Sequence, residues 1–283
     1  MIAGTGVRGF AALLLASTSV WSQGCSDTTP ADPKAGMREI YYLSDLPGQI
    51  PSVHSIVEGA LAERDSQFTA EQLEIAKQVI REQFASEKLE KRVLEFLEQQ
   101  ALREHLGETL EWLRTPLGRK IVQARIAIHS PVGSAEMTRF VEQKEVNPPS
   151  RKRLELIERY DAAALLSGMA SETVLLSAYG IAVMVDALKP EGERLGPEAL
   201  LDSMNSQRSL LEPIFEETSA MTSLFAFRDL SDEELEALVI FAESAAGRWY
   251  HGTTSSVFLE TLRETTASLG DTFIVALLAQ PPS

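Results

Sequence analysis

Cysteine is almost absent from this sequence: among 283 residues there is one, Cys25. The rest of the chain can therefore form no disulfide, no thiolate nucleophile and no thiolate metal site. The four histidines lie far apart, and no pair has the spacing of a zinc site. They are His54, His105, His129 and His251. We expect neither a metal ion nor a cofactor.

Catalytic signatures and positive charge are scarce as well. The sequence has no Gly-x-Ser-x-Gly elbow, no Ser-x-x-Lys, no phosphate-binding loop and no dinucleotide-binding glycine turn. Its 26 Lys and Arg against 41 Asp and Glu give a formal net charge of -15, whereas nucleic-acid binding needs clustered positive charge. Three acidic pairs stand one helical turn apart, a spacing at which charged side chains are usually solvated. They are Glu71/Glu74, Glu87/Glu90 and Glu233/Glu236. We expect a protein that is not an enzyme and does not bind nucleic acid.

The amino terminus has the pattern of an export signal. Arg8 precedes an apolar stretch, residues 10–21, which is too short to span a bilayer. Gly24-Cys25 then resembles a bacterial lipobox, in which the thiol is lipidated and becomes the first residue of the mature protein. Cleavage by an ordinary signal peptidase and a chance apolar start are the alternatives. We expect residues 1–25 to be a signal peptide and Cys25 the lipid attachment site.

A tether is predicted after Cys25. Residues 26–36 are small and polar, contain two prolines, and are typical of a flexible linker. Ser26 resembles the residue that directs lipoproteins to the outer membrane. We therefore expect an exported protein on the periplasmic face of the cell envelope, attached to the outer membrane by its lipid.

Helical patterns dominate the remaining chain. Capping boxes begin at Thr69 and Ser231, and apolar residues follow each of them at three- and four-residue spacing. No segment alternates with period two as a half-buried strand would. We predict an all-α multi-helix bundle without a substantial β-sheet. Prolines and glycine predict a loop or very short helices at residues 41–53, and Pro213 should separate two helices, residues 197–211 and 214–227.

The most apolar segment lies in the second half. Between Ala162 and Val185 the only charged residue is Glu172. A membrane span needs about 20 apolar residues, and Gly168 and Gly180 weaken this segment as a span. We predict a buried central helix.

A nine-residue pattern occurs twice, at residues 112–120 and 241–249, at a constant offset of 129 residues. In each copy an aromatic residue is followed by a hydroxyl residue suited to N-capping and then by Gly-Arg, and Pro116 suits the first helical position. The pattern predicts a sharp corner between two helices. Anion binding at the helix N-terminus beside the arginine is the alternative. The corner residues are Trp112, Thr115, Pro116, Gly118 and Arg119, and then Phe241, Ser244, Gly247 and Arg248.

The offset predicts an internal duplication. We expect a first helical repeat at residues 37–146 and a second at residues 151–283, packed as one globular unit. The phrase at residues 230–235, with Phe241, Ser244, Gly247 and Arg248, resembles the bacterial exported family that carries the domain of unknown function 2059. The resemblance is best over residues 205–260, although Ala245 stands where the family often has proline. It implies helices and an envelope location, and no mechanism.

Three functions from different classes follow. The first is a non-catalytic interaction or scaffold module of the envelope, bound to the membrane through its lipid and to an envelope protein. The second is a carrier of an apolar small molecule or lipid in a helix-lined cavity, suggested by the apolar segment at residues 162–185. The third is an enzyme built on carboxylates such as Glu104 and a lone histidine, which the sequence supports least.

Overall fold

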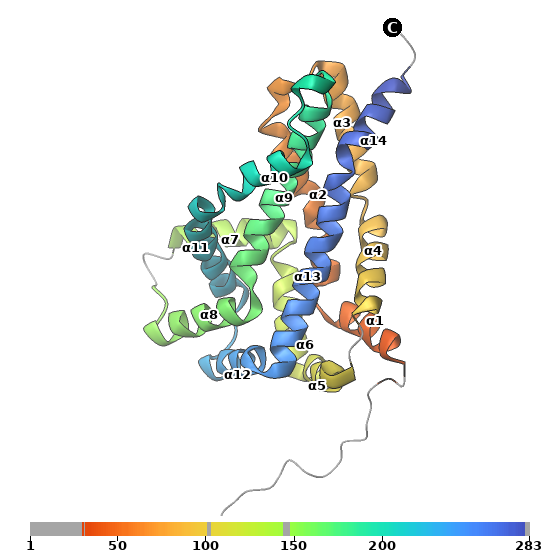
Figure 1. Ribbon diagram of the computed structural model, residues 1–283. Helices are drawn as coiled ribbons and strands as arrows, with labels where there is room; N and C mark the ends of the chain where they lie inside the picture. Colours follow the sequence, from red (N-terminus) through yellow and green to blue (C-terminus); the bar gives the residue numbers. More distant parts are fainter. Residues whose placement is uncertain (1–29, 31, 101–102, 144–147, 281–283) are drawn as a thin grey trace, which may run out of the picture.

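The computed structural model describes residues 30, 32–100, 103–143 and 148–280, and within these ranges the chain is all-α (Figure 1). No strand occurs in the described ranges, and the predicted helical bundle is confirmed. The signal peptide, Cys25 and residues 26–29 of the predicted tether lie outside them.

Six helices form the first half and six the second, and a connecting helix joins the halves. The first six are α1 (Pro33–Leu43), α2 (Leu46–Ala62), α3 (Ala70–Gln83), α4 (Ser86–Gln99), α5 (Arg103–Arg114) and α6 (Pro116–Ala127). The connecting helix is α7 (Pro131–Gln143). The next six are α8 (Arg151–Ala164), α9 (Leu166–Ala187), α10 (Pro197–Asn205), α11 (Arg208–Ala226), α12 (Asp232–Glu243) and α13 (Ala245–Ala267), and α14 (Leu269–Leu278) follows.

Helix order and helix packing repeat between the halves. Both α5 and α12 begin and end 129 residues apart, and so do the starts of α6 and α13. In the first half α4 packs on α1 and α2, and in the second half α11 packs on α8 and α9. Helices α2 and α9, which hold the same place in the two series, also pack on each other. This arrangement supports the proposed duplication.

The two halves share their cores. The larger hydrophobic cluster joins buried residues of α1 to α6 with others from α9, α13 and α14. A second cluster joins Ile121 of α6 to α8, α11 and α12. Neither half buries its apolar face alone, so the chain folds as one unit.

Helix α9 lies at the centre of this unit. It packs on α2, α10, α11, α13 and α14, and Figure 1 shows it running beside α13 through the middle of the molecule. In the described part of the chain α9 is the only helix long and apolar enough to cross a membrane by length and composition, and 56% of its most apolar window is buried. Its packing partners explain the apolar composition, because a helix covered on several sides needs no polar face.

Three expectations about helix ends were wrong, and proline position explains two of them. Residues 33–36 belong to α1 instead of a tether, because Asp32 accepts a hydrogen bond from the Lys34 N–H and Pro33 suits the first turn. Residues 41–53 form the end of α1 and the start of α2, and α11 runs through Pro213. Pro51 and Pro213 each stand at the sixth position of their helix, where little preceding helix is disturbed. The last predicted helix is interrupted at Ser268, where α14 begins.

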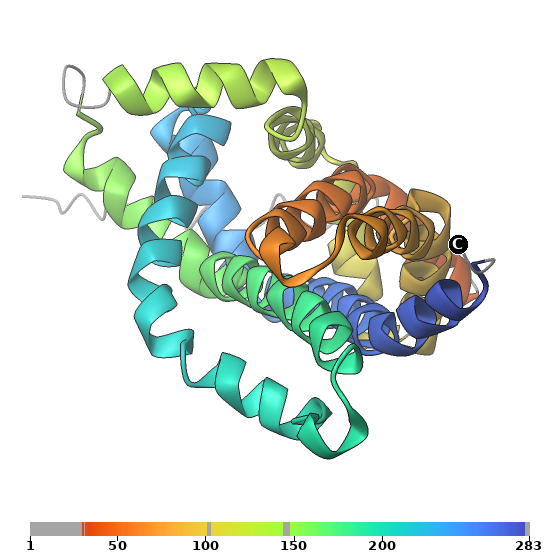
Figure 2. The same cartoon turned by 90° about the horizontal axis from the view of Figure 1, so that it is seen from above.

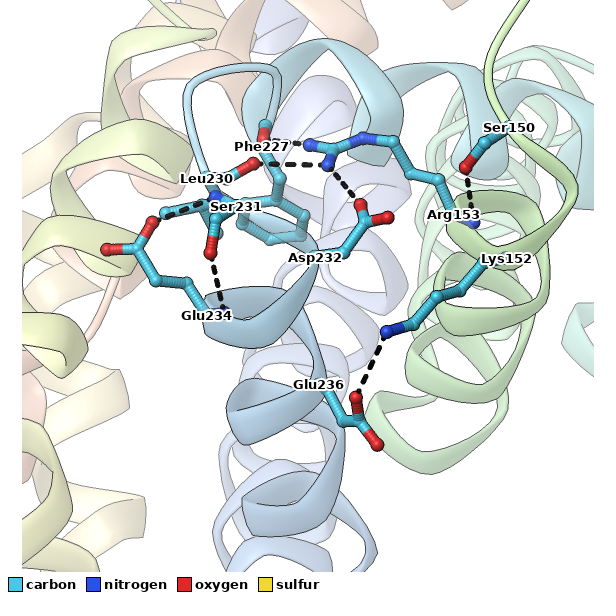
Figure 3. Close-up of polar contacts among 9 residues, drawn as sticks. All are labelled: Ser150, Lys152, Arg153, Phe227, Leu230, Ser231, Asp232, Glu234 and Glu236. Atoms are coloured by element: carbon cyan, nitrogen blue, oxygen red, sulfur yellow. Dashed lines mark hydrogen bonds and ion pairs between the residues drawn. The ribbon is translucent and has the colours of Figure 1, made fainter.

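The turn between α11 and α12 is held by the first turn of α8 (Figure 3). The Arg153 guanidinium donates to the carbonyl oxygens of Phe227 and Leu230 and to the Asp232 carboxylate. Lys152 pairs with Glu236 at 3.4 Å. Arg153 therefore satisfies two carbonyls that follow α11, which fixes the position of that helix beside α9.

Candidate functional site

A cavity of about 240 Å³ lies beside the amino-terminal half of α9, between α2, α6 and α11. Figure 2 shows α11 running along the outer side of α9. The cavity walls are mainly aliphatic and aromatic. They include Val53 and Ile56 of α2, Leu166, Met169 and Val174 of α9, Phe215 of α11 and Phe258 of α13. This position matches the apolar segment from which the sequence suggested a carrier.

One wall of the cavity carries small hydroxyl side chains from α11. They are Thr218, Ser219, Thr222 and Ser223. The Ser219 hydroxyl donates to the Asp161 carboxylate, which also accepts from the Ser167 N–H and hydroxyl. The Thr218 hydroxyl donates to the Ile214 carbonyl 2.7 Å away. The wall is therefore lightly polar but partly self-satisfied.

A charged pair forms the inner end of the cavity. Arg125 of α6 donates from Nε to Asp45 Oδ2 at 2.5 Å, and Gln49 donates to the same oxygen at 2.6 Å. The side chains of Arg125 and Asp45 are 18% and 12% exposed. Burial alone would raise the pKa of Asp45, but the charge and hydrogen bonds of Arg125 outweigh it and hold this pKa below its usual range. Both groups are therefore charged, and the pair is neutral as a whole.

Two histidines adjoin this pair and are neutral at pH 7. Burial, helped by the charge of Arg125, lowers the pKa of His251 to about 3. Burial also lowers the pKa of His129, on the cavity wall. Among the described residues, His251 Nε2 is buried without a hydrogen-bond partner. It borders a second cavity of about 30 Å³, room for about one water molecule.

Two tyrosines complete the polar cluster. The Arg125 Nη1 group donates to the Tyr160 hydroxyl at 3.4 Å. Burial raises the pKa of both Tyr160 and Tyr250, so both phenols stay protonated. The cluster thus offers neutral donors and acceptors around one neutralised charge pair, a composition suited to holding a ligand by hydrogen bonds.

The described residues do not assemble a catalytic centre around this cavity. No group of three or more His, Cys, Asp or Glu side chains that could hold a metal ion occurs among them. The acidic group nearest the histidines, Asp45, is already occupied by Arg125 and Gln49. Glu104 and His105 stand on α5 and do not line the cavity. The arrangement supports binding better than proton transfer.

The two predicted corners form between α5 and α6 and between α12 and α13. Thr115 accepts from the Gly118 N–H at 2.9 Å, and Ser244 accepts from the Gly247 N–H at 3.0 Å. Each hydroxyl also donates, at 2.7 Å, to the carbonyl of the aromatic residue three positions earlier. Pro116 occupies the first position of α6. These hydrogen bonds link each incoming helix to the first turn of the outgoing one.

Neither corner arginine is brought to the cavity. Arg119 and Arg248 are both exposed, and Arg248 donates to the Glu243 carbonyl at the end of α12. The corner residue Trp112 borders the small cavity, and so do Gly118 and Phe241. The geometry therefore gives the corners a positional part beside the buried polar cluster.

Sequence reasoning missed Asp45, Gln49 and Arg125. Asp45 falls in the segment that was expected to be a loop. A signal for Arg125 was present, because it shares a helical face with Ile121 and Ile128, where a solvated arginine is not expected. A charge on an apolar face predicts a buried partner, although it does not say which acid that partner is.

Comparisons with models of known protein families, with curated proteins and with solved structures give no match. The resemblance of residues 205–260 to the family with the domain of unknown function 2059 therefore stays a prediction.

Proposed function

We propose that this protein is a non-catalytic binding protein that holds a small apolar molecule in the cavity beside α9. The proposal includes export, a lipid on Cys25 and a place on the periplasmic face of the envelope, as the sequence predicts. A tethered binder of this kind would take up an apolar compound that water dissolves poorly.

One observation supports the proposal above the others: the two halves fill the same place with different side chains. In the first half, α4 presents Leu89, Val93 and Leu97 to the core, all at most 2% exposed. In the second half, α11 presents Ser219, Ser223 and Phe227 at the same four-residue spacing, with exposures of 8%, 4% and 0%. Serine therefore stands twice where the other half has a large aliphatic residue.

Small side chains at core positions are unfavourable unless something else fills the space. An unfilled cavity destabilises a protein by about 24 cal/mol per Å³, so a purely structural helix in this place would gain stability from leucine and valine. Two serines on one face of α11, next to Thr218 and Thr222, are the arrangement expected when the space is kept for a ligand.

The test fills the cavity from α11. Wild-type protein purified from its native host should show, in native mass spectrometry, an added small mass that is released on denaturation. Ser223→Leu should lose that mass and gain about 0.5–2 kcal/mol of stability. Ser209→Leu, on the exposed face of the same helix, is the matched control and should keep the mass. A wild-type protein that carries no added mass and binds no apolar probe contradicts the proposal.

A scaffold function is the second candidate, and the surface of α11 favours it. Leu210 and Ile214 lie one turn apart on this helix and are 73% and 59% exposed. Apolar side chains in such pairs are common at protein interfaces. Crosslinking in the host should then depend on Leu210→Glu and Ile214→Glu and be indifferent to Ser223→Leu.

A further inference from the structure

The cavity has an unusual charge composition for a protein of net charge -15. Among the residues that line it, the only groups able to carry charge are Arg125 and His129, and no carboxylate is among them. Every other lining side chain is aliphatic, aromatic, hydroxyl or amide. Any charge on a ligand would therefore have to be matched by Arg125.

Arg125 has no net charge to offer. Its Nε group is bonded to Asp45 at 2.5 Å, and Gln49 fixes the carboxylate from its other side. An anion added here would place two carboxylates around one guanidinium in a largely buried site, where an unmatched charge costs several kcal/mol. Asp161, behind Ser219, would repel it further. A cation would meet the guanidinium itself.

Hydrogen-bonding capacity nevertheless remains at this end of the cavity. Guanidinium carries five N–H donors, and the described contacts use Nε and Nη1 of Arg125. Nη2 has no hydrogen-bond partner among the described residues. A carbonyl or hydroxyl oxygen of a ligand could accept from it without bringing charge.

The volume limits the size of the ligand. At roughly 30 Å³ per water-sized unit, the cavity of about 240 Å³ holds a chain of about eight such units. An alkyl chain of that length, lying along the apolar side chains of α9 with its head at Arg125, fits the distribution of polar groups.

We infer that the ligand is an apolar molecule with an uncharged polar head, such as a medium-chain alcohol, ester or amide, and that the Asp45–Arg125 pair excludes the corresponding anion. The inference rests on the proposed function, because it assigns the chemistry of the same cavity.

The experiment compares three probes that differ only in the charge of the head: octan-1-ol, octanoate and octylammonium. Calorimetric titration of the purified wild-type protein at pH 7.5 should give an affinity for octan-1-ol at least tenfold higher than for either ion. Octanoate or octylammonium binding as tightly as octan-1-ol overturns the inference and leaves the proposed function standing. Binding of none of the three overturns both.

A variant tests the part played by the charge pair. Asp45→Asn keeps the shape of the side chain and leaves the Arg125 charge without its partner, so octanoate should gain at least tenfold relative to octan-1-ol. An unchanged ratio in a folded variant contradicts the assignment to Asp45. If the variant does not fold, the wild-type comparison of the three probes still decides. Ser223→Leu is the control and should weaken all three probes alike.

Discussion

Trp112 and Phe241 stack face to face, with ring centroids 4.7 Å apart and an interplanar angle of 10°. Phe241 follows Trp112 by 129 residues, so each ring holds the same place in its own corner. Helices α2 and α9, equivalent in the order of the two halves, also pack on each other. Contact between equivalent parts is the arrangement of an isologous dimer interface, here within one chain.

The stacked rings should be energetically coupled. Trp112→Ala and Phe241→Ala each remove apolar contacts, and the double variant should be less destabilised than the sum of the two by about 0.5–1.5 kcal/mol. Urea denaturation of the four proteins measures this coupling. Strictly additive changes would show that the stack contributes nothing beyond burial.

Gly247→Ala should destabilise the protein by about 1–3 kcal/mol. A Cβ there would lie well under 3.0 Å from the Phe241 carbonyl oxygen, on backbone that cannot turn away. Gly59→Ala is the matched control, because a Cβ at this helical position meets nothing within 4 Å, and it should stabilise α2 by about 0.5–1 kcal/mol. Thermal unfolding separates the two, and an equal effect at both sites would refute the close approach at the corner.

Arg153 and Arg151 should differ although they are two residues apart. Arg153→Met removes three hydrogen bonds to the turn after α11 (Figure 3) and should cost about 2–3 kcal/mol, the range for bonds to a charged group. The Arg151 side chain is 92% exposed, and Arg151→Met should change stability by less than about 0.5 kcal/mol. Guanidinium denaturation is the measurement. Similar losses in both would mean that the turn does not depend on Arg153.

Acid should destabilise the protein through His251. Its pKa is about 3 in the folded protein and about 6.5 when unfolded, so the unfolded state takes up the proton first. The stabilisation is complete above about pH 6.5 and is lost as the pH falls toward 3, by about 1.4 kcal/mol per pH unit. Wild type should therefore lose about 2 kcal/mol more than His251→Phe between pH 7 and pH 5.

His129 and Asp45 titrate in both proteins, so the difference between wild type and His251→Phe isolates His251. Phenylalanine keeps a ring beside Tyr160 and Tyr250, which contact His251. Stability should be measured by urea denaturation at each pH. Parallel curves for the two proteins would show that His251 is not buried in its neutral form.

The parts of the fold that the sequence predicts are those determined by neighbouring residues. The caps at Thr69, Thr115, Ser231 and Ser244 depend on a hydroxyl and an N–H two or three residues away, so the local pattern is enough. The course of α11 through Pro213 could not be read in this way. There the buried side chains that follow, such as Leu224, keep the helix in place against the local preference.

The candidate site depends on residues that are distant in the sequence. Asp45 and Arg125 stand 80 residues apart, and nothing near either one names the other. The cavity could not be predicted either, because a serine on a helix is equally compatible with an exposed face. Only the comparison of α4 with α11 in space shows that Ser219 and Ser223 occupy core positions.

The place of α14 bears on how the chain is made. This last helix packs on α3 and α9, and its Leu269 and Phe273 are fully buried. A ribosome adding roughly 5–20 residues per second therefore finishes the partner of α3 well after α3 itself has emerged. Until then the apolar face of the first half has no cover, so the nascent chain stays open to holdase chaperones and remains loose enough to be threaded through a translocation pore.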